Sequence, residues 1–82
     1  MYGGLDVVKT LDLHGIRHAE VEREVIRFIE ANWNTGNELK IIIGHSPVMQ
    51  KLVVGVLDDY KLDYRIGNYL GFDKTFISVY DV

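Results

Sequence analysis

Asp12 and His14 place an acid and an imidazole two residues apart, within the segment Leu11-Asp12-Leu13-His14-Gly15. Apolar and polar residues alternate over 8–13, which predicts a half-buried strand that ends at Gly15. On such a strand the two side chains share a face and lie roughly 6.6 Å apart. One can then act on a substrate group as a base and the other as an acid. Alternatively, Asp12 caps the following turn and His14 is an ordinary surface histidine.

The helix expected after this pair begins without a capping side chain. Ile16, Arg17 and His18 stand where Ser, Thr or Asp is preferred. Free amide groups, the positive end of the helix dipole and the two basic side chains predict a phosphate-binding site beside Asp12. The alternative is a frayed helix start with two solvated basic residues.

A second corner, Gly44-His45-Ser46-Pro47, follows the apolar segment 39–43. Ser46 is a natural N-cap and Pro47 a natural first helical residue. If the two strands are neighbours, His45 approaches the first corner. Asp12, His14 and His45 then offer carboxylate and imidazole groups to a divalent metal. Their spacing matches no closed metal motif, so no metal ligands are predicted and a divalent cofactor stays open.

The hydrophobic periodicity predicts a single domain over 1–82, with a lead-in at 1–8. Strands are expected at 8–13, 39–43, 62–66 and 75–80, and helices at about 18–33 and 47–60. Trp33 is expected on the buried stripe of the first helix and Ile66 on the helix-facing side of the sheet. Gly67 is expected to open a loop that runs to Lys74. The fold class is α/β: a two-layer β-α-β-α-β-β sandwich with a mixed four-stranded sheet and two helices on one face.

The opposite face of this sheet is expected to carry Ile42, Phe76 and Tyr80. Aromatic side chains on an open sheet can stack on nucleic-acid bases. They can also cover a protein partner or a second copy of the chain, and this interface interpretation is favoured.

The composition narrows the function classes. The 82 residues carry a net charge of −3 and no cysteine, which fits a cytoplasmic protein without disulfides. Neither a membrane span nor a signal peptide is expected. Nucleic-acid binders are usually basic, so such a role requires basic side chains gathered locally.

The segment Leu11-Asp12-Leu13-His14-Gly15 resembles the LDLHG motif of the Smr (small MutS-related) domain family, and the order of elements over nearly the whole chain is similar. The resemblance implies a two-layer α/β domain that binds or nicks DNA or RNA, with Asp12 and His14 at the motif positions associated with cleavage and binding. The family's second motif is usually His-Gly-x-Gly or Thr-Gly-x-Gly. Here the matching run is Ile43-Gly44-His45-Ser46, which keeps only Gly44.

The leading hypothesis is a stand-alone Smr-like domain, a nicking endonuclease with Asp12 and His14 as catalytic residues. The predicted substrate-binding residues surround them: Gly15, Arg17, His18, Gly44, His45 and Ser46. The alternative is a non-catalytic module that binds nucleic acid or protein through the same corner and the open sheet face. A third class, a self-associating or regulatory domain without a nucleic-acid role, agrees with the acidic charge.

Overall fold

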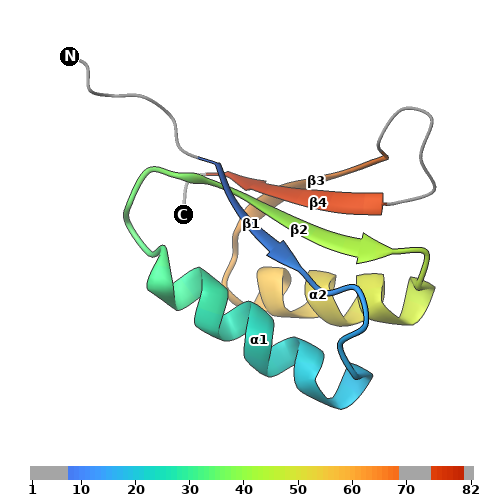
Figure 1. Cartoon of the computed structure of the whole chain (residues 1–82). Coiled ribbons are helices and arrows are strands. Elements are labelled where there is room, and N and C mark those ends of the chain that lie inside the picture. The colour runs from blue at the N-terminus through green and yellow to red at the C-terminus, as the bar shows by residue number, and fades with distance from the viewer. Residues whose placement is uncertain (1–7, 69–74, 81–82) are drawn as a thin grey trace.

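The computed structural model describes residues 8–68 and 75–80, which form four strands and two helices (Figure 1). In chain order these are β1 (Val8–Asp12), α1 (His18–Ala31), β2 (Glu38–Gly44), α2 (Pro47–Asp59), β3 (Asp63–Asn68) and β4 (Thr75–Tyr80). None of the helices in these ranges is long and apolar enough to cross a membrane.

The strands form one mixed sheet in the order β1-β2-β4-β3. β1 pairs with β2 in parallel, whereas β4 lies antiparallel to both β2 and β3. Both helices lie against the same face of the sheet (Figure 1). The predicted α/β sandwich and the antiparallel last strand are therefore confirmed, and β1 and β2 are neighbours.

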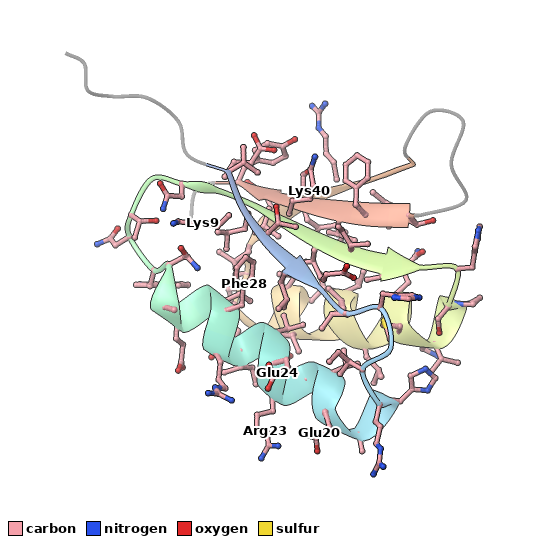
Figure 2. The ribbon with its side chains drawn as sticks, viewed as in Figure 1. Lys9, Glu20, Arg23, Glu24, Phe28 and Lys40 are labelled. Carbon is pink, nitrogen blue, oxygen red and sulfur yellow. The ribbon has the colours of Figure 1, made fainter. Side chains whose placement is uncertain are left out.

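The core lies between the sheet and the two helices. Alternate residues of β2 are buried because successive side chains on a strand point to opposite faces. In β4 the consecutive residues Ile77, Ser78 and Val79 are all buried. The helical stripes close the core from the other side. The fully or nearly fully buried apolar residues are Leu13, Val21, Val25, Ile29, Leu39, Ile41, Ile43, Met49, Val53, Val56, Leu57, Ile77 and Val79. Phe28 packs against this cluster from α1 (Figure 2).

The first helix is shorter than predicted. It ends at Ala31, where the Asn32 side chain donates a 2.9 Å hydrogen bond to the carbonyl of Phe28. Asn34 and Gly36 then adopt positive φ angles of 63° and 76°, which turn the chain away from the helix axis. The prediction that Trp33 belongs to the buried helical stripe is wrong. Trp33 is 50% exposed, and its ring packs edge-on against the ring of Tyr60, with 5.9 Å between the two ring centres.

The third strand runs further than predicted, because it includes Gly67 and Asn68. Gly67 lies opposite Phe76 in β4. A Cβ atom at Gly67 would stand 3.0 Å from the ring of Phe76, so the aromatic ring takes the space that a side chain would fill. The prediction that Gly67 ends the strand is therefore wrong, and the rest of the predicted loop, 69–74, lies outside the described residues.

Ile66 lies on the predicted face of the sheet but is not buried there. It pairs with the buried Ile77, so it lies on the helix-facing side of the sheet. It is nevertheless 47% exposed, because β3 is the outer strand of the sheet in the order above.

Candidate functional site

The first corner, residues 12–18, joins β1 to α1 through a turn that Asp12 organises. Its Oδ1 atom accepts a 2.9 Å hydrogen bond from the backbone N–H of His14. This is the local bond by which an aspartate stabilises a turn two residues ahead. Gly15 follows with φ 83°, a conformation that a Cβ atom would strain. Asp12 therefore has the predicted capping role, and both Asp12 and His14 are exposed to solvent.

The start of α1 lacks a side-chain cap, as predicted. Arg17 occupies the N-cap position in an extended conformation, and its side chain makes no capping hydrogen bond. His18 is the first helical residue, and both side chains are exposed. The amide groups of the first turn thus point toward a corner that contains a permanent cation.

Two acidic residues that the sequence reading did not assign to the site lie beside Arg17. Gly15, Ile16, Arg17, Glu20 and Glu24 line a hollow of about 530 Å³. Arg17, Glu20 and Glu24 share a helix face because they are spaced i, i+3 and i+7. This spacing can be read in the sequence, so the position of Glu20 and Glu24 beside Arg17 was predictable from it.

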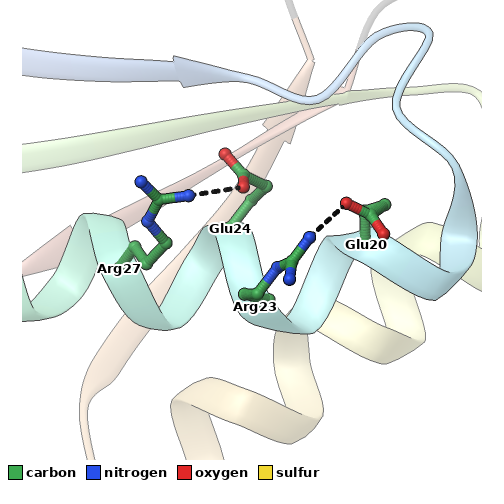
Figure 3. A network of polar contacts seen from close by, with 4 residues as sticks. All are labelled: Glu20, Arg23, Glu24 and Arg27. Atoms are coloured by element: carbon green, nitrogen blue, oxygen red, sulfur yellow. Dashed lines mark hydrogen bonds and ion pairs between the residues drawn. The ribbon is translucent and has the colours of Figure 1, made fainter.

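The negative charges of Glu20 and Glu24 are partly neutralised by ion pairs. Glu20 pairs with Arg23 at 2.6 Å, and Glu24 pairs with Arg27 at 3.3 Å (Figure 3). Exposed pairs of this kind contribute little to stability. They nevertheless set opposite charges beside both carboxylates, so the negative field that Arg17 meets is weaker than two isolated glutamates would produce.

The second corner, residues 44–47, joins β2 to α2 and has its own capping group. The Ser46 hydroxyl accepts a 3.1 Å hydrogen bond from the backbone N–H of Met49, and Pro47 is the first helical residue. Gly44 has φ 65°, which accounts for glycine at this position. Ser46 thus caps α2, as predicted.

Residues 44–47 also line a hollow of about 270 Å³ together with Gln50 and Thr75. Thr75 lies opposite Gly44 in the β2–β4 ladder. Sequence reading did not assign Thr75 to the site, since its neighbour is 31 residues away in the chain and only the strand order brings the two together.

A side-chain contact joins the two corners. Nε2 of His18 lies 3.4 Å from Oγ of Ser46, which is long for a hydrogen bond between such groups. The parallel register places Asp12 beside Ile42, and the N–H of Leu13 donates a 2.9 Å hydrogen bond to the carbonyl of Ile42. The loops that follow β1 and β2 therefore leave the sheet side by side.

The three-ligand metal arrangement considered from the sequence is not formed. Over residues 8–68 and 75–80, no three His, Asp or Glu side chains are grouped so that they could hold a metal ion. Asp12, His14 and His45 all fall within these ranges. The corners contain one carboxylate, three imidazoles, one guanidinium and the Ser46 hydroxyl, together with backbone amides.

The open face of the sheet carries the residues predicted for a partner surface. Ile42 and Phe76 are paired neighbours and half-buried, while Tyr80 is 37% exposed. Lys40 projects from this face, away from the helices (Figure 2), and its Nζ atom lies 4.7 Å from the centre of the Phe76 ring. This cation–π contact covers part of the ring that a base would stack on.

Comparison of the chain with protein-family models, with curated proteins and with solved structures finds no match.

Proposed function

We propose that the chain is an Smr-like domain that binds nucleic acid at the joined corners and nicks its phosphodiester backbone. The observation that carries this proposal is the contact between His18 and Ser46. It lies between the two corners, which together contain all three histidines of the chain and Arg17. Imidazole and guanidinium groups beside helix amides are suitable ligands for a phosphate.

Asp12 is the proposed catalytic carboxylate. One oxygen holds the turn through the N–H of His14, and a carboxylate has a second oxygen with which to orient or deprotonate water. His14 follows the same turn and is exposed. Its imidazole would assist proton transfer or contact the phosphate. Arg17, His18 and His45 would contact neighbouring phosphates.

The charge distribution predicts a modest electrostatic contribution to binding. The whole chain is acidic, at −3, and Arg17 is the one permanent cation among the predicted site residues. Since each neutralised phosphate contributes about 0.7–0.9 to the salt slope, Arg17→Gln should lower that slope by about 1. A slope that stays unchanged would remove Arg17 from the phosphate contacts.

Cleavage is tested by incubating supercoiled plasmid and structured RNA with wild type and Asp12→Asn. Asparagine keeps an oxygen that can accept the hydrogen bond from His14, so the turn survives while the base is lost. We expect nicking to fall by about 100-fold or more, with binding retained. Asp59→Asn, the same change at an exposed position at the end of α2, should cut like wild type. Equal cleavage by wild type and Asp12→Asn would exclude Asp12 from the mechanism.

The second candidate is a non-catalytic module that binds nucleic acid through the same corner. The bond from His14 to Asp12 favours it, because a turn-stabilising role by itself accounts for an aspartate at this position. Salt-dependent binding by the folded wild type, without any product, would support this candidate over the nuclease. Absence of binding to both DNA and RNA would exclude both.

A further inference from the structure

β3 forms one edge of the sheet, because β4 is its neighbour on one side and no other strand of the described sheet lies on the other. An edge strand presents backbone N–H and C=O groups that can pair with a further strand. Asp63 and Arg65 lie on β3 and are exposed. Tyr64 between them is half-buried.

An apolar row of the helix-facing side ends uncovered on this edge. Ile66 lies beside Ile77, which lies beside Ile41 in the next strand. Ile77 and Ile41 are fully buried, whereas Ile66 is 47% exposed. A strand added outside β3 would extend the same row and cover Ile66.

The sequence of β3 is complementary to itself. In an antiparallel pairing centred on Tyr64, Asp63 of each copy lies opposite Arg65 of the other, so two ion pairs form on the open face. On the helix-facing side Tyr64 meets its own copy, and Ile66 lies opposite Leu62, the residue just before the strand. Directly opposite side chains have Cβ atoms about 4.5–5.5 Å apart, within reach of such pairs.

The other edge, β1, has no such register. Its charged residues are Lys9 and Asp12. Lys9 pairs with Leu39 and shares that residue's helix-facing side, whereas Asp12 pairs with Ile42 on the open side. Antiparallel pairing places residues of the same face opposite one another, so no self-pairing of β1 sets Lys9 against Asp12.

We propose that the protein forms a two-fold homodimer through antiparallel pairing of β3 with its copy, which joins two sheets into one of eight strands. The occupant of this edge is a second copy because the charge pattern of β3 complements itself. β1 lies at the opposite edge of each sheet, so both joined corners stay outside the interface. This dimer does not require the proposed function. A single pair of strands makes a small interface, so association should be weak and concentration-dependent.

The test is sedimentation equilibrium of the whole chain over a range of concentrations. Wild type should shift from monomer to dimer. Asp63→Arg or Arg65→Asp replaces both cross-strand ion pairs with like charges and should weaken association by about tenfold or more. The double variant Asp63→Arg with Arg65→Asp restores opposite charges and should return the dimer. Lys9→Glu, a charge reversal on the other edge strand, should leave association unchanged.

Tyr64→Cys tests the register, since the proposed two-fold axis places this residue against its own copy. Mild oxidation should produce a disulfide-linked dimer faster than it does with Thr10→Cys on β1. Circular dichroism checks that each variant is folded. A wild-type monomer at every concentration overturns the proposal. The proposal is also overturned if both single charge reversals dimerise like wild type, or if the double variant does not regain the dimer.

Discussion

The two corners both turn the chain from a strand into a helix, but they differ in how the start of the helix is capped. Both turn at a glycine with positive φ, Gly15 at 83° and Gly44 at 65°. At the second corner Ser46 caps α2 and Pro47 begins it. At the first corner Arg17 occupies the cap position and caps nothing.

The start of α2 therefore has a side-chain hydrogen-bond acceptor for one of its amides, whereas the start of α1 has none. The Ser46 hydroxyl already accepts the N–H of Met49, and Pro47 has no N–H to offer. The first turn of α1 lacks a side-chain acceptor. The N–H of Glu20 donates to the carbonyl of Arg17, so an anion would be bound by the amides before Glu20. Natural sequences give up such local stabilisation at functional positions, which favours the first corner as the site of the proposed chemistry.

The largest expected change in stability comes from replacing the glycine with positive φ that each corner contains. Gly15→Ala and Gly44→Ala should each lower the free energy of unfolding by about 1–2 kcal/mol, because both positions have left-handed φ angles. Gly55 lies exposed within α2 with no atom near its missing Cβ. Gly55→Ala should therefore raise stability by about 0.5–1 kcal/mol. Urea unfolding measures all three, and an equal loss at Gly55 would contradict the φ argument.

Removing the cap of the second corner should have the next largest effect. Ser46→Ala leaves the Met49 amide without its acceptor and should cost about 1 kcal/mol. Ser46→Thr, which keeps the hydroxyl, should cost less, as measured by the same unfolding experiment. If alanine and threonine cost the same, the hydroxyl contributes nothing to the start of α2.

Adding a helix cap to the first corner should raise the stability of the protein, whereas removing the cap of the second corner lowers it. Arg17→Asn places a good N-cap side chain on a backbone already in the extended conformation of that position. Stability should rise by about 0.5–1 kcal/mol, while binding of nucleic acid weakens. Thermal unfolding and a fluorescence-anisotropy titration measure the two quantities. Lys51→Asn, at an exposed position in α2, should leave binding unchanged. Tighter binding by Arg17→Asn would contradict the anion site.

The smallest expected effect lies at the far ends of the two helices, where Tyr60 donates a 3.1 Å hydrogen bond to Glu30. Partial desolvation, that hydrogen bond and the charge of Glu30 raise the pKa of Tyr60 above its ordinary value of 10.0. The folded state thus keeps the phenol proton to higher pH than the unfolded state does. This stabilisation is fully present below pH 10 and is lost as pH rises through the raised pKa.

The stability difference between wild type and Tyr60→Phe should therefore be constant below about pH 9 and shrink above pH 10. Denaturant unfolding at a series of pH values measures it. Glu30→Gln removes the charged partner and should flatten this dependence. If the stability difference between wild type and Tyr60→Phe grew with pH, the folded state would not raise the pKa of Tyr60, and the prediction would be wrong.

Much of the fold follows from local patterns in the sequence. Strand alternation around Leu11, Ile41 and Ile77 and the helical stripe through Val25 predict which faces are buried, because side-chain direction repeats with a fixed period in each element. Boundaries were less predictable. Trp33 continues the helical period, yet α1 ends at Ala31, where Asn32 bonds to the chain before it.

Local sequence patterns predict the type and order of the helices and strands, the uncapped start of α1 and the Ser46-Pro47 start of α2, since these depend on neighbours within a few positions. The candidate residues at each corner follow from the same patterns. Which groups distant in the sequence meet depends on the tertiary structure. It placed His18 beside Ser46, Thr75 beside Gly44, and Phe76 against Gly67. It also left Ile66 uncovered at the edge. Strand order and register, which depend on packing summed over the whole sheet, decide these contacts.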